Sequence, residues 1–232
     1  MKLEVFWTDQ FSPDIPLPVS EGLPEEVDVA IVGSGYTGLT AARVLAKAGN
    51  SVAVMDQYEI GWGASSRNGG MATPGLKQDI FKIHKKYGMD YAREFWKSSV
   101  DAIDLLEQII IEENIDCDWS RKGHIALACK QSHYDELLEY AAWIKKEMGH
   151  EKTIVPRDEI RSEIGTDAYF GGLSDESSGG LQPAKYVDGL ARAVADLGVR
   201  LYENTRVEKI CRNNGAHELI TSKGYMLSLI HI

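Results

Sequence analysis

Three glycines, Gly33, Gly35 and Gly38, have the spacing of a backbone turn that can lie against a phosphate. They stand in the run GSGYTG, which directly follows an apolar stretch that begins at Val27. In such a turn the first glycine permits the sharp bend, the second lets a pyrophosphate approach, and the third lets the next helix pack on the strand. N–H groups at the start of that helix face the phosphates, and the helix dipole favours their negative charge. The prediction of dinucleotide binding also covers the intervening residues: Ser34, Tyr36 and Thr37.

A carboxylate follows this turn at the place where the ribose of an adenosine would lie. A predicted helix over residues 37–47, a stop at Gly49 and a predicted strand over 51–55 lead to Asp56. Asp56 could accept hydrogen bonds from the ribose hydroxyls, and it would repel a 2′-phosphate. The alternative is an ordinary β-α-β unit whose acidic residue is a solvated strand end. The complete order of strand, glycines, helix, strand and carboxylate favours a dinucleotide site.

A second stretch of small and polar residues, GWGASSRNGGM at 61–71, follows closely. Its glycines and serines could bring backbone N–H groups to a flat ligand, and a guanidinium and an amide add polar contacts. By itself the stretch would be interpreted as a surface loop, because glycine and serine are common there. Its place directly after the acidic strand end favours a second cofactor-contacting loop, formed by Ser65, Ser66, Arg67, Asn68, Gly69 and Gly70.

The rest of the chain must supply the elements that hold these two loops. Apolar residues spaced by three and four predict a helix over 90–113 with one buried face: Trp96, Val100, Ile103, Leu106 and Ile110. A strand near 123–129 precedes a helix near 134–146, whose inward residues are Leu137, Leu138, Ala141 and Ile144. The short, mixed pattern of residues 151–175 is compatible with a smaller layer that faces a substrate.

From Gly180 the pattern returns to the nucleotide-binding part. Pro183 suits a first helical turn, Gly198 ends that helix, and its expected buried face is Val187, Leu190, Val194 and Leu197. Strands are predicted near 199–202, 206–210 and 218–221, with a turn at Asn213-Asn214-Gly215. The prolines between residues 11 and 24 predict an extended lead that wraps onto the domain.

Residues 27–77, with GSGYTGLTAARVLAKAG and GWGASSRNGG, resemble the N-terminal part of the D-amino-acid-oxidase-like (DAO) family of FAD-dependent oxidoreductases. The likeness is to the branch that includes gamma-glutamylputrescine oxidase. It extends to RKGHIALA at 121–128, LQPAKYVDGLARA at 181–193 and GVRLYENTRVEKI at 198–210, and covers roughly residues 5–225. Asp56 departs from the family pattern, which more often has glutamate, and its side chain is one methylene shorter.

The resemblance implies FAD as the cofactor and oxidation of the C–N bond of an amine or amino acid. It places the pyrophosphate at the glycine turn, the adenosine ribose at Asp56, and the flavin side of the cofactor along the second loop. It also implies that the backbone of Val207 touches the adenine, although a buried strand residue is equally compatible. It names no catalytic residue.

The implied fold class is α/β, a Rossmann-like FAD-binding domain with an interleaved smaller substrate domain of α+β type, truncated at its C-terminus. The predicted segments are an extended lead (1–26), the first FAD-binding part (27–113), a substrate part (114–180), the FAD-binding return (181–225) and a tail (226–232). The tail, MLSLIHI, does not continue the family pattern, in which a buried strand is expected. We interpret it as non-native sequence after an incomplete gene; the alternative is a short protein whose tail forms an edge strand.

Composition limits the other function classes. The net charge of -10 argues against a nucleic-acid-binding surface, and no apolar run is long enough to cross a bilayer. The N-terminus lacks the apolar core of a secretory signal, so a cytoplasmic location is expected. Cys117, Cys129 and Cys211 are widely spaced, and the histidines lack zinc-site spacing, so no metal is assigned.

Three hypotheses remain open at this point. The first is an FAD-dependent oxidoreductase of small amines or amino acids, present as its N-terminal portion. The second is a non-catalytic dinucleotide-binding module, and the third is an NAD-dependent dehydrogenase. The second glycine loop and the return segment favour the first hypothesis over the third, and nothing in the sequence determines the oligomeric state.

Overall fold

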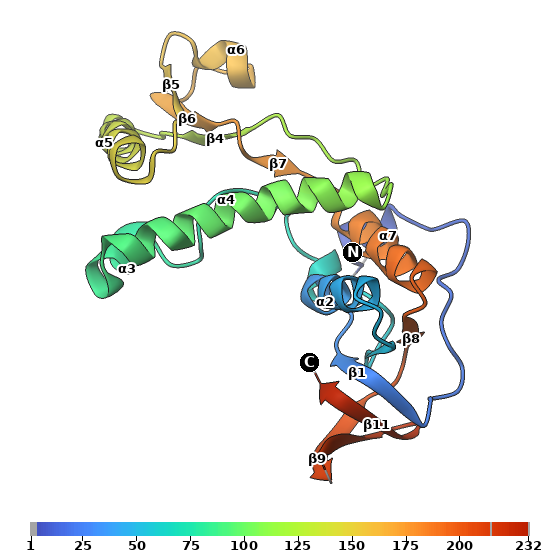
Figure 1. Cartoon of the computed structure of the whole chain (residues 1–232). Coiled ribbons are helices and arrows are strands. Elements are labelled where there is room, and N and C mark those ends of the chain that lie inside the picture. Colours follow the sequence, from blue (N-terminus) through green and yellow to red (C-terminus); the bar gives the residue numbers. More distant parts are fainter. Residues whose placement is uncertain (1–3, 214, 232) are drawn as a thin grey trace. The chain divides into compact units, whose positions relative to one another are not determined.

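A computed structural model describes residues 4–213 and 215–231 of the chain. The chain forms two compact units, each assembled from separate stretches of sequence (Figure 1). Unit 1 comprises residues 1–70, 110–118 and 182–232, and unit 2 comprises residues 71–109 and 119–181. Because the chain passes repeatedly between them, neither unit is one continuous segment.

Unit 1 is built on a mixed sheet in which the described strands have the order β8-β2-β1-β11-β10-β9. The strands that pair in parallel are β1 (Glu26–Val32), β2 (Val52–Met55), β8 (Arg200–Tyr202) and β11 (Gly224–His231). The antiparallel members are β9 (Val207–Asn213) and β10 (Ala216–Thr221). All of β2 is buried, as expected for a strand inside a parallel sheet that is covered on both faces.

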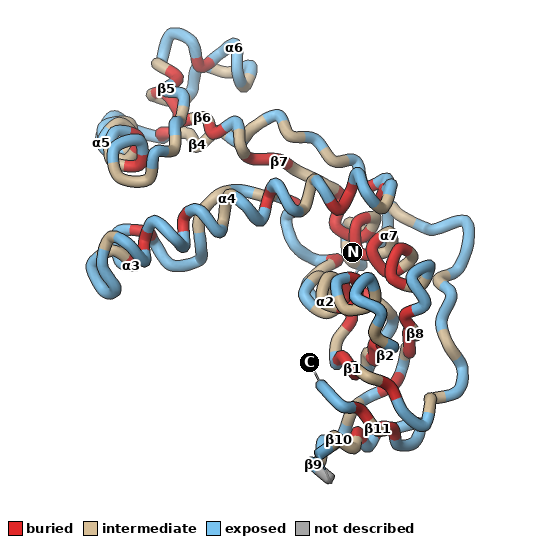
Figure 2. Tube along the Cα trace, viewed as in Figure 1, coloured by how far each residue is buried: buried red, intermediate tan, exposed pale blue. Residues whose placement is uncertain are grey.

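Two helices of unit 1, α2 (Tyr36–Lys47) and α7 (Pro183–Asp196), pack beside each other, and Figure 2 shows buried residues along both. Pro183 lies in the first turn of α7, as predicted, and Val187, Leu190 and Val194 are buried. The prediction was wrong for Leu197, which is 38% exposed. Leu197 is the C-cap residue, so it lies beyond the buried face of the helix.

A buried cation links α2 to the short stretch 110–118 of unit 1. Arg43 is only 6% exposed, and its guanidinium pairs with the carboxylates of Glu112 and Glu113. Lys47 Nζ lies 2.6 Å from Glu113 Oε1 and completes the cluster. These pairs satisfy a charge that would be costly to bury alone.

The C-terminal residues form a strand within the sheet, and two expectations about them were wrong. Strand β11 lies between β1 and β10, so it is an interior strand and not the edge strand of the alternative interpretation. Met226 and Ser228 are fully buried, so a buried strand does follow Ser222. The origin of the tail sequence stays a prediction, and Ile232 lies outside the described residues, as does Asn214 of the predicted turn.

Unit 2 contains two small antiparallel sheets. One pairs β3 (Met71–Ala72) with β7 (Gly179–Gly180), and the other has the order β4-β6-β5. The members of the second are β4 (His124–Leu127), β5 (Thr153–Pro156) and β6 (Gly171–Asp175). This mixture of small antiparallel sheets and helices agrees with the expected α+β character.

The helices of unit 2 are α3 (Ile80–Tyr87), most of α4 (Met89–Glu112), α5 (Gln131–Met148) and α6 (Ile160–Ile164). The long predicted helix is present almost to the residue, but α5 is longer than the predicted 134–146 at both ends. One core cluster joins α3, α4 and α5 through Ile80, Ile83, Ala92, Trp96 and Ile144. The unit boundaries therefore differ from the predicted ones, because residues 71–109 bury their apolar side chains in unit 2 and not with the glycine turn.

Candidate cofactor-binding site

The glycine turn between β1 and α2 has the backbone geometry that its sequence predicts. Gly33 has φ +103°, and its N–H donates to the Met55 carbonyl at 2.8 Å. A Cβ atom at Gly38 would lie 2.0 Å from the Gly33 carbonyl oxygen, so only glycine permits this approach. The N-cap residue of α2 is Gly35, which has no side chain to cap the helix, and backbone N–H groups at such a helix start favour an anion.

Ser34 joins this turn to the carboxylate at the end of β2. Its N–H and hydroxyl both donate to Oδ2 of Asp56, at 2.9 and 2.7 Å. Its Oγ accepts the N–H of Gly61 at 2.9 Å, so Ser34 also holds the beginning of the second loop. The other carboxylate oxygen of Asp56 accepts the N–H of Tyr58 at 3.1 Å. Asp56 is therefore an anchor of the turn in its own right, a role that the sequence pattern did not reveal.

The second loop meets the start of α2 through Ser65. Its hydroxyl oxygen accepts the N–H of Tyr36 at 3.0 Å. A Cβ atom at Gly35 would lie 2.9 Å from the same oxygen, so the two loops touch where the predicted pyrophosphate contact lies. Ser66 ends the 3-10 turn η1 (Ala64–Ser66) and is buried, with a long hydrogen bond to the Gly63 carbonyl at 3.4 Å.

Asn68 organises the rest of this loop. Its side-chain amide donates to the carbonyls of Ala64 and Ser65 at 3.2 and 3.0 Å, and its Oδ1 accepts the N–H of Gly70 at 2.8 Å. Gly70 is buried with φ +70°, and Gly69 between them is exposed. The amide of Asn68 therefore closes the loop on itself.

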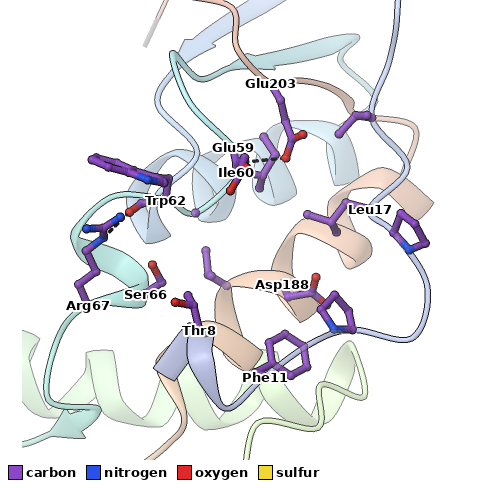
Figure 3. A pocket seen from close by; sticks show the side chains of 16 residues that line it. Thr8, Phe11, Leu17, Glu59, Ile60, Trp62, Ser66, Arg67, Asp188 and Glu203 are labelled. Carbon is purple, nitrogen blue, oxygen red and sulfur yellow. Dashed lines mark hydrogen bonds between the residues drawn. The ribbon is translucent and has the colours of Figure 1, made fainter. Parts of the chain in front are cut away.

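Arg67 is held by the same loop. Its Nε donates to the Trp62 carbonyl at 2.7 Å, and its guanidinium lies 3.9 Å from the centroid of the Trp62 ring (Figure 3). The Tyr58 ring stacks on Trp62 with 4.2 Å between centroids. This exposed stack of two rings and a guanidinium was not predicted from the sequence.

Tyr36, the first residue of α2, is partly buried. Its ring packs against Tyr186 of α7 at 5.2 Å between centroids, and its hydroxyl lies 3.4 Å from Nδ2 of Asn68. Burial raises the pKa of the Tyr36 hydroxyl, and the contact with Asn68 partly opposes that shift. Thr37, next in the turn, is exposed.

Val207 begins β9 and is brought toward Asp56 by the residues before it. The N–H of Thr205 donates to the Asp56 carbonyl at 2.7 Å, and the N–H of Asn204 donates to the Tyr58 carbonyl at 2.9 Å. Val207 itself is partly buried against the core of the sheet. The structure thus gathers the predicted residues of both glycine loops, Asp56 and the start of β9 into one region of unit 1.

A cavity of about 540 Å³ lies beside the second loop, in unit 1 (Figure 3). Its walls come from the N-terminal lead, from residues 59–62 where the second loop begins, and from α7, and it shares Ser66 and Arg67 with the predicted site. Glu203 lines it and accepts the N–H of Ile60 at 2.9 Å. The cavity does not include the glycine turn, so it overlaps the predicted cofactor site only in part.

Within the described residues, no three His, Cys, Asp or Glu side chains are grouped as a metal ion would require. No disulfide joins Cys117, Cys129 and Cys211 in the described part of the chain. None of the described helices has the length and apolar character needed to cross a membrane.

The chain spans about half the length of the curated relatives that it matches. It is 36% identical over 205 residues to "Probable oxidoreductase OrdL" of Haemophilus influenzae, covering 88% of this chain and 47% of that protein. It is 36% identical over 183 residues to the gamma-glutamylputrescine oxidoreductase of Escherichia coli, covering 79% and 43%. The crystal structure of glycine oxidase from Geobacillus kaustophilus superposes with a TM-score of 0.74 at 25% identity, covering 90% of this chain and 55% of that one.

A family profile described as "FAD dependent oxidoreductase" (DAO) matches residues 28–226, which include both glycine loops, Asp56 and Val207. The match covers both units and most of the chain. It confirms the predicted family, the mixed α/β fold and FAD as the cofactor of that family. The chain belongs to the DAO family of FAD-dependent oxidoreductases.

Proposed function

We propose that unit 1 holds the AMP and pyrophosphate portion of FAD in an oxidoreductase of amines or amino acids. The observation that carries this proposal is the contact between the two glycine loops, where Ser65 Oγ meets the N–H of Tyr36. That contact lies at the start of α2, where backbone N–H groups and the helix dipole favour a phosphate. The residues therefore fit the negatively charged middle of the cofactor.

Each predicted site residue has a role in this proposal. The backbone of residues 33–38 binds the pyrophosphate, and the second loop extends the binding surface toward the flavin. Asp56 uses its remaining acceptor capacity for the ribose, while the strand start at Val207 borders the adenine. The proposed cofactor-binding residues are Gly33, Ser34, Gly35, Tyr36, Thr37, Gly38, Asp56, Ser65, Ser66, Arg67, Asn68, Gly69, Gly70 and Val207.

When bound, FAD supplies a hydride acceptor at flavin N5 for the carbon that bears the substrate nitrogen. The residues of this chain bind and orient the cofactor and set the charge around it. A neutral amine gives up hydride more readily than an ammonium ion, so a productive site must disfavour the protonated substrate. No described side chain is assigned as the base.

The names of the relatives support an amine or amino-acid substrate. The Escherichia coli protein is a gamma-glutamylputrescine oxidoreductase, and a 27% identical relative from Geobacillus kaustophilus is a glycine oxidase. This chain spans 47% and 43% of the first two relatives, so the activity of the whole protein is part of the proposal. A cytoplasmic location likewise stays a prediction from the sequence.

Flavin binding and flavin reduction test this proposal separately. The chain is titrated with FAD and followed by quenching of flavin fluorescence, with Gly63→Ala as a control because a Cβ there meets nothing within 4 Å. The whole open reading frame that carries this sequence is then mixed anaerobically with primary and secondary amines and amino acids. Bleaching of the flavin spectrum is expected.

The outcomes distinguish the competing functions. A flavin that binds but is reduced by none of these substrates would favour a non-catalytic dinucleotide-binding module. A protein that binds neither free FAD in titration nor flavin during expression would overturn the cofactor site itself.

A further inference from the structure

The N-terminal strap, which we define as residues 4–24, lies outside the segment that matches the family profile. It is nevertheless fixed to unit 1 along its length. The N–H of Ser20 donates to the Leu201 carbonyl of β8 at 2.7 Å, and the guanidinium of Arg192 in α7 donates to the Ile15 carbonyl at 2.5 Å. The strap is therefore held in place on unit 1. Its first residues can restrict the movement of the residues that they contact.

The first residues of the strap touch the second glycine loop through Trp7. The indole N–H of Trp7 donates to the backbone carbonyl of Asn68 at 2.7 Å. The Trp7 carbonyl accepts the side-chain amide of Gln182 at 3.0 Å. Gln182 is the N-cap of α7, and its Oε1 accepts the N–H of Lys185 at 2.9 Å. Trp7 thus connects the capped start of α7 to the loop.

Asn68 connects the Trp7 hydrogen bond to the rest of the second glycine loop. Its side chain holds the carbonyls of Ala64 and Ser65 and the N–H of Gly70, so its position sets the shape of the loop. Ser65 in turn meets the N–H of Tyr36 at the start of α2. A continuous series of hydrogen bonds therefore runs from Trp7 to the glycine turn.

We infer that Trp7 is a positioning residue that holds the second glycine loop against the glycine turn, and that the strap thereby sets how tightly FAD is retained. The naming of FAD rests on the proposed function. The ordering of the loop by Trp7 is a property of this chain alone, so it is measurable without cofactor.

The strap and the second glycine loop also border the same cavity. Thr8 and Phe11 of the strap line the same cavity as Ser66 and Arg67 of the loop, and Thr8 lies beside Ser66 (Figure 3). Within the described residues, the hydrogen bond from Trp7 connects the strap directly to the backbone of this loop.

Limited proteolysis measures the loop directly, because the exposed Arg67 places a trypsin site immediately before Asn68. Trp7→Phe removes the indole N–H and keeps an aromatic ring. Losing one hydrogen bond of ordinary strength should raise the rate of cleavage at the Arg67–Asn68 bond about 3- to 10-fold when cleavage follows local opening. Rates are taken from mass spectra of early time points, without added FAD.

The matched control is Trp143→Phe, the same change in unit 2, where the Trp143 ring packs on Phe81. This control should leave cleavage at Arg67 unchanged. In Trp7→Phe, cleavage after Arg212 in β9 should match the wild type, because the restraint is local. Equal cleavage at Arg67 in wild type and Trp7→Phe would overturn the inference. A uniform increase at both sites would also overturn it, because that result indicates general destabilisation of unit 1.

An FAD titration separates this inference from the proposed function. If the wild type binds FAD, Trp7→Phe should raise the dissociation constant by a similar factor, and FAD should protect the Arg67 site. If the wild type binds no FAD while Trp7→Phe still accelerates cleavage, the proposed function fails and the positioning role stands. Unchanged FAD affinity and unchanged cleavage in Trp7→Phe would overturn the inference and leave the proposed function intact.

Discussion

At the residue scale, two serine hydroxyls connect the glycine turn to its surroundings. Ser34 binds the carboxylate of Asp56, and Ser65 binds the N–H of Tyr36. The sequence pattern identified all four residues as cofactor contacts, but it did not reveal that they bind one another. Those pairings depend on β1 and β2 lying side by side in a fixed register, which places Val32 opposite Met55 and so brings Ser34 beside Asp56.

The double role of Asp56 leads to a graded prediction. Asp56→Ala removes the acceptor for both hydrogen bonds of the buried Ser34, so it should lower the free energy of unfolding by about 1–3 kcal/mol and also weaken FAD binding. Asp56→Asn keeps one oxygen acceptor and should cost less stability while still weakening the ribose contact. Urea unfolding and FAD titration measure the two effects. Wild-type values for Asp56→Ala in both assays would contradict both roles.

Gly35 gives a sharper test of the phosphate contact. A Cβ atom there would lie 2.9 Å from Ser65 Oγ, and the branched side chain of Gly35→Val would also fill the space beside the turn. We expect Gly35→Val to abolish flavin binding, measured as bound flavin absorbance after gel filtration. Gly63→Ala serves as the control that retains binding. Full flavin occupancy in Gly35→Val would remove the basis for the proposed pyrophosphate site.

At the element scale, helices were predicted better than strands. A helix depends on residues close together in the sequence, whereas a strand depends on partners that can be far away in it. The stripe of α4 is a local pattern, and Trp96, Ile103 and Ile110 are buried as that pattern requires. Strand β11 depends on distant partners: Ser228 Oγ accepts the N–H of Ala30 at 2.9 Å across 198 residues of sequence. No local pattern in the tail indicated that partner, so its interior position was missed.

The burial of β11 predicts which of its residues contribute to stability. Met226 is fully buried in the core of the sheet, whereas Leu229 is 53% exposed. Met226→Ala should lower the free energy of unfolding by about 2–5 kcal/mol, because it leaves a cavity in the core. Leu229→Ala should change it by less than about 1 kcal/mol. Chemical denaturation followed by circular dichroism measures both, and equal effects would show that β11 does not occupy its interior position.

At the scale of the whole molecule, the two units could not be delimited from the sequence alone. The predicted boundary at residue 113 followed the end of a helix, but α4 contributes to both units and the chain changes unit at residue 110. The polar core of unit 2 was also missed. There His150, Lys152 and Ser177 surround the carboxylate of Asp175, which is 4% exposed. These residues lie on separate elements, so their grouping appears only in the folded chain.

This polar core predicts that acid destabilises unit 2. Burial alone would raise the pKa of Asp175, but hydrogen bonds from His150, Lys152 and Ser177 outweigh it and hold the pKa well below its usual range. A lowered pKa stabilises the fold above the unfolded-state value of about 3.9, and this contribution is lost as the pH falls below it. Asp175→Asn should therefore cost about 3 kcal/mol at pH 7, and progressively less as the pH falls below about 4. Urea unfolding monitored by tryptophan fluorescence measures the difference, with the exposed Asp167→Asn as a control expected to show none. A cost for Asp175→Asn that stays constant from pH 7 to pH 3 would show that the charge of Asp175 does not stabilise the unit.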